Sequence, residues 1–306
     1  MIFDIVLNQM IVFFLVLLTG AAASKLGVIR KDYLPDFAKL ISKVLLPVML
    51  FFLTYSRSTR ETVFENLPMI GLAAAFYVVI IAVTWVLAKI LRPVGDKAKV
   101  FRFAFIFGNT GFVGIPLLAA LFPDSGPLYL ALFSIIDQAL FWTYGIYLAT
   151  ASGTKARINA KSFVNPNLIA MALAFAFVLI GIPLPGVVCD TLGLIANGTS
   201  AMCMLYLGAL CYFSNLKDAL RSKELYAGIA VKMIALPVAA GWLLKATPLD
   251  PTMTTSLVLL MALPTMTVVP MIAKMHGTEG DYAAGLTVGT LVASVVTIPL
   301  VALLAL

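Results

Sequence analysis

Two apolar segments of the chain carry polar and helix-breaking residues that could bind a small ligand. The segment FGNTGFVGIPLLAALF (107–122) contains Asn109, Thr110, Gly111, Gly114 and Pro116. The segment ALPTMTVVP (262–270) contains Pro264, Thr265, Thr267 and Pro270. Proline interrupts the hydrogen-bond ladder of a helix, and glycine lets a second backbone approach, so the freed carbonyl and amide groups can bind a substrate or an ion. We therefore predict that these residues bind the substrate, with close helix packing as the alternative use of small residues.

Two ionisable residues, Asp137 and Lys232, fall in the middle of other apolar segments. Helix geometry puts Asp137 roughly 14 Å and Lys232 roughly 11 Å from the nearer end of its segment. An unpaired charge at that depth costs at least about 2.5 to 3.5 kcal/mol. We expect the two residues to pair, or to take turns in binding a proton and an anionic substrate. The alternatives are that Lys232 snorkels to the cytoplasmic interface and that Asp137 makes a structural hydrogen bond to freed backbone.

The amino-acid composition indicates the environment that surrounds these residues. Of all residues, 62% are hydrophobic and 11% are charged, and the mean hydropathy is +1.04. Soluble globular chains have roughly 25% charged residues. The apolar runs are long, as in membrane-spanning helices, and do not have the alternating pattern of short strands in a membrane barrel. The sequence therefore predicts an all-α integral membrane protein in a lipid bilayer.

Ten apolar runs are long enough to cross a bilayer, for which about 20 residues are needed. The connections between them are short, which leaves no segment for a soluble domain. Any function must then sit inside the helix bundle. The predicted helices cover residues 4–23, 34–54, 67–89, 102–122, 128–150, 166–182, 188–213, 225–245, 252–274 and 282–305.

The basic residues predict how the chain is oriented. Most Lys and Arg residues between the helices fall in odd-numbered connections, which the positive-inside rule places in the cytoplasm. Both termini are then extracytoplasmic. Arg57, Arg60 and Lys245 lie in even-numbered connections and count against this orientation. We interpret the net charge of +7 as an orientation signal and expect no nucleic-acid partner.

The chain has the spacing of an internal repeat. An offset of 154 residues aligns Pro116 with Pro270 and sets FGNTGFVGIP over MALPTMTVVP. The halves are residues 1–153 and 154–306, with five predicted helices each. Because five is odd, the second half enters the membrane from the opposite side, which makes the repeat inverted. Inverted repeats with paired interrupted helices are typical of secondary transporters, whose binding site lies near the membrane midplane.

Four stretches resemble the auxin efflux carrier family, specifically its short bacterial members, and the resemblance covers essentially the whole chain. They are GNTGFVGIPLLAALF, KVLLPVMLFFLTYSR, ALPTMTVVPMIAKMHG and GLTVGTLVASVVTIPLV. The resemblance implies two inverted five-helix repeats in which helices four and nine are broken and cross each other. It also implies a scaffold of helices 1, 2, 6 and 7 beside a transport unit of helices 3–5 and 8–10.

The resemblance also assigns roles to residues. The crossover asparagine and proline of the family fall on Asn109 and Pro116, and the prolines of helix nine fall on Pro264 and Pro270. Family members often have a proline in helix seven that matches Pro47 of helix two. This chain has NGTSAMCMLYLGAL there, so its scaffold departs from the family pattern.

We expect a secondary active transporter that moves a small organic anion by alternating access of the elevator type, coupled to H⁺ or Na⁺. The resemblance suggests malonate, malate or an auxin-like acid as substrate, a bacterial inner membrane as location and a homodimer as a possible assembly. One alternative is a cation/proton antiporter of the same architecture, with Asp137 as the ion-binding carboxylate. A channel is another, although the inverted repeat favours a carrier.

Cofactor and enzyme motifs do not occur in this sequence. There is no GxxxxGK[ST] loop for a nucleotide and no HExxH or Ser/Lys dyad within a predicted helix. Cys189, Cys203 and Cys211 lack metal-site spacing, and the single histidine, His276, lies far from them in sequence. We expect no cofactor, no metal and no enzymatic activity.

Several further side chains are predicted to lie at the membrane interface. Lys39 and Lys43 have the position of snorkelling residues at the start of helix two, with attraction of anions to the inner mouth as the alternative. Trp142, Tyr144 and Tyr147 fit an aromatic belt near the inner end of helix five.

Overall fold

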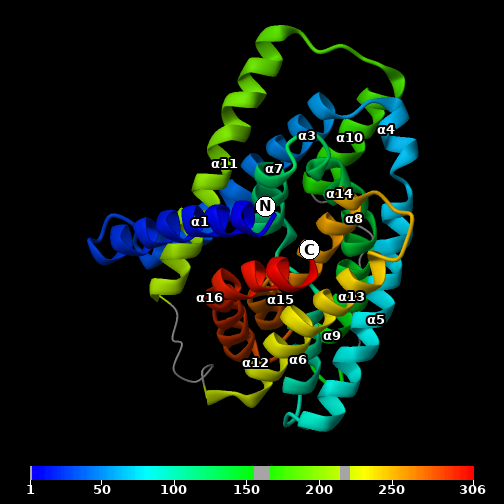
Figure 1. The fold of residues 1–306 in the computed structure, drawn as a ribbon. Coiled ribbons are helices and arrows are strands. Elements are labelled where there is room, and N and C mark those ends of the chain that lie inside the picture. Colours follow the sequence, from blue (N-terminus) through cyan, green and yellow to red (C-terminus); the bar gives the residue numbers. More distant parts are fainter. Residues whose placement is uncertain (1, 155–165, 214–220) are drawn as a thin grey trace.

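The computed structural model describes residues 2–154, 166–213 and 221–306, and in these ranges the chain is built from helices (Figure 1). Seven helices are long and apolar enough to cross a membrane: Phe3–Lys25, Lys31–Arg57, Arg60–Leu91, Gly126–Ala149, Gly186–Phe213, Lys223–Leu244 and Gly280–Ala305. Three apolar helices are shorter: Thr110–Leu121, Pro166–Ile180 and Pro251–Ala262. The prediction of an all-helical membrane protein is therefore confirmed for the described residues.

Each of the predicted apolar runs overlaps one helix or a consecutive set of helices. Some sets contain a π-helical turn, which the labels mark as η. The bounds are α1 Ile2–Lys25, α2 Leu34–Leu40, η2 Ile41–Leu45, α3 Leu46–Arg57, α4 Arg60–Glu65, α5 Pro68–Leu91, α6 Lys97–Ile106, η3 Thr110–Gly114, α7 Ile115–Leu121, α8 Gly126–Leu140, η4 Phe141–Gly145, α9 Ile146–Ala149, α10 Pro166–Ile180, α11 Gly186–Phe213, α12 Lys223–Gly228, η7 Ile229–Ala235, α13 Leu236–Leu244, α14 Pro251–Ala262, α15 Val269–Met275 and α16 Gly280–Ala305.

Helices α1 and α11 cross with their backbones in close contact. A Cβ added to Gly208 would lie 1.9 Å from the carbonyl oxygen of Leu17, and one added to Gly20 would lie 2.2 Å from that of Leu205. Small residues permit such close approach, which drives helix association in lipid. α3 packs against α10 and α11 on the same side of the molecule. These helices form one packed group, of which α3 and α10 contribute to the site described below.

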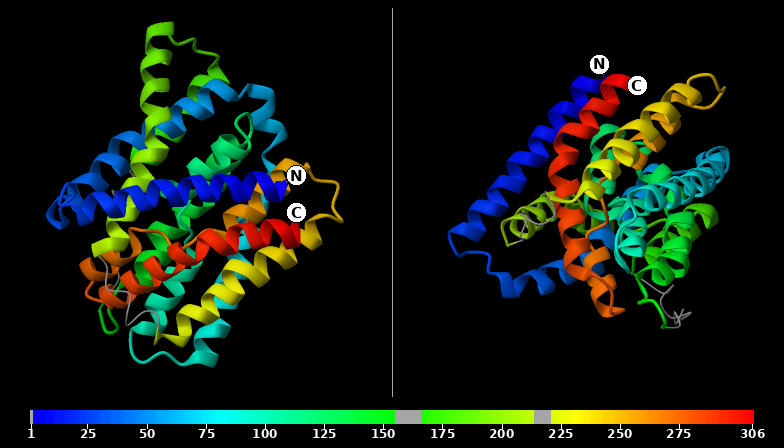
Figure 2. Two further views of the ribbon diagram at one scale, coloured as in Figure 1. Left: turned by 60° about the vertical axis from the view of Figure 1, so that its left-hand side comes forward. Right: turned by 90° about the horizontal axis from the view of Figure 1, so that it is seen from below.

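A second packed group contains the remaining helices. α5 packs against α6 and α8, α14 packs against α13 and α8, and α16 packs against α15 and η7. Buried aromatic rings fill the space between them, with the Phe107 ring 5.2 Å from that of Phe141 and 5.9 Å from that of Tyr77. The start of α1 and the end of α16 lie side by side at one end of the bundle (Figure 2).

Hydrogen bonds between the connections that join the helices group these connections into two sets. In one set, the Arg57 guanidinium donates to Asp124 Oδ1 at 2.8 Å, and the Tyr129 hydroxyl donates to Asp250 Oδ1 at 3.1 Å. Arg57 follows predicted helix two, Asp124 lies between predicted helices four and five, and Asp250 lies between eight and nine. All three therefore belong to even-numbered connections, so these connections meet at one end of the bundle.

The other set joins odd-numbered connections. The Ser152 backbone N–H donates to Asp96 Oδ2 at 3.1 Å, and the Ala151 N–H donates to the His276 carbonyl at 3.3 Å. Hydrogen bonds from Ser152 hold the pKa of the Asp96 carboxyl below its usual range. The third, fifth and ninth predicted connections are thus tied together.

Candidate substrate site at two paired helix breaks

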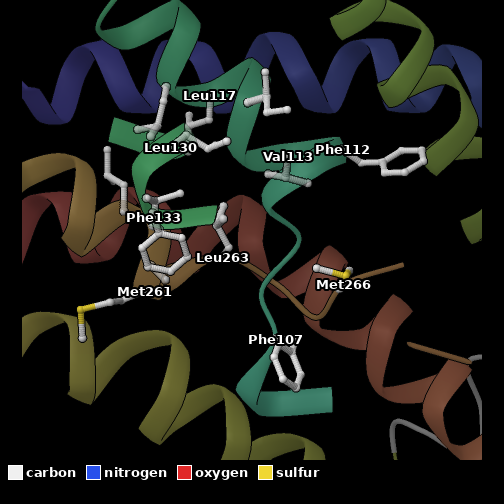
Figure 3. Close-up of a cluster of buried hydrophobic side chains, with 14 of the residues drawn as sticks. Phe107, Phe112, Val113, Leu117, Leu130, Phe133, Met261, Leu263 and Met266 are labelled. Atoms are coloured by element: carbon white, nitrogen blue, oxygen red, sulfur yellow. The ribbon is translucent and has the colours of Figure 1, made fainter. Parts of the chain in front are cut away.

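The helix bundle contains two interruptions that pair with each other. α6 ends at Ile106 and η3 begins at Thr110, while α14 ends at Ala262 and α15 begins at Val269. Gly108 and Thr265 form an isolated antiparallel bridge between the two breaks. Figure 3 shows the non-helical strand after Phe107 and the segment that holds Met266 close together.

Backbone hydrogen bonds satisfy groups that the breaks free. The Asn109 N–H donates to the Pro264 carbonyl at 2.7 Å, and the Met266 N–H donates to the Phe107 carbonyl at 3.1 Å. Buried backbone groups need such partners, because hydrocarbon offers none. The two breaks therefore stabilise each other.

Proline and glycine explain why the breaks form here. Pro264 disfavours helical geometry in the residue before it, and Leu263 is extended at φ −58° and ψ 145°. A Cβ on Gly108 would lie 3.2 Å from the Leu263 Cβ and 3.6 Å from the Leu260 carbonyl oxygen. Gly108 lets the two broken segments approach each other. It was not among the site residues predicted from the sequence.

Asn109 has one satisfied and one unsatisfied side-chain group. Its Oδ1 accepts a hydrogen bond from the Phe112 N–H at 3.1 Å, which caps the first turn of η3. The side chain is fully buried, and its Nδ2 has no hydrogen-bond partner among the described residues. An unsatisfied buried donor costs about 1 to 3 kcal/mol, so the Asn109 Nδ2 would be stabilised by a hydrogen-bond acceptor.

A cavity of about 270 Å³ lies beside Asn109. Of the predicted site residues, Asn109, Thr110, Gly111 and Thr267 line it. The remaining lining residues are mainly apolar and come from both packed groups of helices. They include Leu46, Leu50, Ile115, Leu130, Phe141, Met171, Met266, Met271 and Ile272.

The other predicted site residues do not line the cavity. They belong to the two breaks and the half-helices that surround it. The Pro264 carbonyl accepts the bond from Asn109, and the Thr265 N–H donates to Thr290 Oγ1 at 3.0 Å. A Cβ on Gly114 would lie 3.0 Å from Leu263 Cδ1. The prolines of the shorter half-helices lie in their first turns, Pro116 in α7 and Pro270 in α15.

Several lining residues were missed or differently assigned from sequence. Trp142, expected from the sequence in an interfacial belt, lines the cavity, and its Nε1 has no hydrogen-bond partner among the described residues. Asn167 of α10 also lines the cavity with an unpartnered Oδ1. Lys43 is exposed and lines the cavity, as the anion-attraction alternative requires.

Three π-helical turns contribute to the cavity wall. Lys43 lies in η2, Gly111 in η3 and Trp142 in η4. A π turn adds one residue to a helical turn and is frequent at functional sites. It also shifts which face of the helix the following residues occupy, so a regular helical projection misplaces them.

Asp137 and Lys232 are both fully buried, with exposed fractions of 0% and 1%. Asp137 accepts hydrogen bonds from the Tyr77 hydroxyl and from Gln138 Nε2, the latter at 2.8 Å. Lys232 donates to the Leu263 carbonyl at the second break. The two do not form an ion pair in this structure, and the burial of Lys232 overturns the snorkelling alternative.

Comparison with known proteins identifies the family. The sequence profile of a family described as "Membrane transport protein" matches residues 5–301. The "Uncharacterized transporter YfdV" of Escherichia coli (strain K12) is 26% identical over 238 residues, which cover 73% of each chain. An "Uncharacterized transporter" of Methanothermobacter thermautotrophicus is 24% identical over 229 residues, 73% of this chain and 74% of that one. The resemblance seen in the sequence is confirmed, and the chain belongs to this membrane transport protein family, that of the auxin efflux carriers.

Proposed function

We propose that the protein is a secondary active transporter that moves a small organic anion through the cavity at the paired breaks. One observation supports this most directly. The Asn109 Nδ2 donor is fully buried, has no partner among the described residues, and belongs to a residue that lines the cavity. A carboxylate oxygen is the kind of acceptor that this donor lacks.

The groups around the cavity suit an acid with an apolar part. Within the ranges that the structure describes, the Trp142 Nε1 is a second donor without a partner, and the Thr267 hydroxyl has none either. Lys43 adds a positive charge that attracts anions to the opening. A volume of about 270 Å³ lies near the lower end of ordinary ligand pockets, so malonate, malate or a compact auxin-like acid would fit in size.

The cavity wall suggests how alternating access could work. Lys43 and Leu46 come from predicted helix two and Asn167 from helix six, which belong to the proposed scaffold. Asn109 and Thr267 come from the proposed transport unit. Movement of helices 3–5 and 8–10 along helices 1, 2, 6 and 7 would expose the site to one side of the membrane and then to the other. This is the elevator arrangement of two inverted repeats, residues 1–153 and 154–306.

The same arrangement agrees with the contacts between connections. Ten spans put odd and even connections on opposite sides, and the hydrogen bonds of Arg57 with Asp124 and of Asp96 with Ser152 join connections of one kind each. We infer that the even set and both termini are extracytoplasmic, in a bacterial inner membrane.

Asp137 is the proposed site of proton coupling. Gln138 donates to Asp137 and also lines the cavity, so it links the buried carboxylate to the place where the anion binds. Binding of the anion would reorient Gln138 and change the hydrogen bonding of Asp137. The lack of an ion-pair partner for Asp137 among the described residues also favours the second candidate, a cation/proton antiporter that binds its ion at Asp137.

Ligand-dependent thermal unfolding tests the anion site. Purified protein is heated with malonate, malate or indole-3-acetate, and apparent affinities are compared for wild type and Asn109→Ala. Loss of one hydrogen bond to a charged group costs about 1.5 to 3 kcal/mol, so we expect binding to weaken by about 10- to 100-fold. Asn197→Ala, on the exposed face of α11, is the matched control and should bind as wild type does. Equal affinity of Asn109→Ala and wild type would contradict the assignment.

A further inference from the structure

Lys232 is a buried lysine at one of the two helix breaks. It lies in η7, is 1% exposed, and donates its ammonium hydrogen bond to the carbonyl of Leu263, the residue that follows α14. Its Nζ lies 3.7 Å from the position that a Cβ on Gly108 would occupy, so the ammonium reaches the point where both breaks meet.

The Lys232 side chain faces no acidic side chain in the described part of the structure. The helices packed against η7 are α12, α13, α14 and α16. No carboxylate of the described residues lies within 4.0 Å of the Lys232 Nζ, and α13 and α14 contain no charged residue. The charged and titratable residues of the other two lie in or near their first turns: Lys223, Glu224, Tyr226, Asp281 and Tyr282.

The carbonyl end of α14 supplies the negative partner instead. The last carbonyl groups of a helix lack intrahelical donors, and the helix dipole adds negative potential there. In carriers with broken helices, such carbonyl ends coordinate the free cation that drives transport. At this break the carbonyl of Leu263 already has a cationic donor that belongs to the chain.

We propose that Lys232 is a built-in cation that takes the place of a free Na⁺ at the carbonyl end of α14, so that the carrier works without sodium. This inference rests on the proposed carrier function. Within it, the ammonium keeps the two breaks together in every step, because a tethered cation cannot dissociate. The free coupling ion is then a proton, which binds elsewhere.

Binding of radiolabelled Na⁺ to purified protein in detergent tests this proposal. Wild type should show no saturable binding. Lys232→Ala removes the ammonium and opens the space around the Leu263 carbonyl, so we expect it to gain saturable Na⁺ binding that unlabelled Na⁺ displaces and choline does not. Lys232→Met lacks the charge but fills the space, and Lys245→Ala removes an exposed lysine that follows the same span. Neither of these should gain binding.

Saturable Na⁺ binding by wild type would overturn the proposal, and so would its absence in a monodisperse Lys232→Ala protein. If Lys232→Ala does not fold, thermal unfolding of wild type in sodium chloride and in choline chloride decides. Equal unfolding temperatures are expected, and a stabilisation specific to sodium would overturn the proposal. Neither measurement uses an organic acid or a flux, so failure here is distinguishable from failure of the proposed anion transport.

Discussion

Two residues at the breaks use their polar groups in different ways. Asn109 uses its Oδ1 to cap Phe112, and its Nδ2 has no partner among the described residues, whereas Lys232 donates to the Leu263 carbonyl. A group that is already satisfied supports structure, and a buried group left unsatisfied is available for a ligand. On this basis we propose that Asn109 recognises the substrate and that Lys232 holds the two breaks together.

The hydrogen bond from Tyr77 to Asp137 yields a prediction at the residue scale. Both side chains are buried, with exposed fractions of 1% and 0%. Tyr77→Phe leaves Asp137 with fewer donors, so we expect the free energy of unfolding to fall by about 1 to 3 kcal/mol. The denaturant midpoint of the purified protein measures this. Tyr33→Phe, at an exposed tyrosine, is the control, and an equal loss in both variants would contradict the role given to Tyr77.

At the scale of the elements, close packing of α1 against α11 depends on small residues. Gly208→Ala places a Cβ 1.9 Å from the Leu17 carbonyl oxygen, which is backbone and cannot rotate away. We expect a loss of about 1 to 3 kcal/mol or more in the free energy of unfolding. In contrast, a Cβ on Gly71 of α5 meets nothing within 4 Å, and Gly71→Ala should stabilise the helix by about 0.5 to 1 kcal/mol. Unfolding temperatures of the two variants check the signs, and destabilisation of both would contradict the packing.

A second element-scale prediction concerns pH. The side-chain and backbone hydrogen bonds from Ser152 lower the pKa of Asp96, which lies between α5 and α6. A carboxyl with a lowered pKa in the folded state adds stability above its unfolded pKa and loses it as pH falls. Wild type should therefore unfold at a higher temperature than Asp96→Asn at neutral pH. The difference should begin to shrink as the pH falls through about 4, the unfolded pKa, and should vanish below the lowered pKa of the folded state. A difference that does not change with pH would show that the carboxylate charge is not involved.

The sequence predicted the helices and their breaks better than it predicted which residues line the cavity. Breaks at Pro264 and near Asn109 follow from local chemistry, since proline and polar residues interrupt apolar helices whatever their surroundings. Trp142 was assigned to an interfacial belt from its position near the inner end of predicted helix five, whereas its place in the cavity wall depends on packing against distant parts of the chain. Asn167 was missed because it reaches the cavity through packing of α10, which depends on distant parts of the chain. The role of Gly108 could not be predicted because it depends on the close approach of Leu263, which is distant in sequence.

At the scale of the whole molecule, the chain ends and connections define a topology that labelling can test. Asp124→Cys and Ser152→Cys, each in a background without the native cysteines, report on an even and an odd connection. In intact cells a membrane-impermeant maleimide should label the first variant and not the second, and lysis should expose the second. Labelling of both in intact cells would contradict opposite placement of these connections.

Flux through reconstituted proteoliposomes tests the central claim most directly. Labelled malonate, malate and indole-3-acetate are each offered with an imposed pH gradient, with a sodium gradient and with neither. We predict that the pH gradient alters the flux of one acid, that sodium has no effect, and that Asn109→Ala abolishes the flux while Asn197→Ala retains it. Absence of flux for every acid, together with sodium or proton exchange that requires Asp137, would contradict anion transport and favour the cation/proton antiporter.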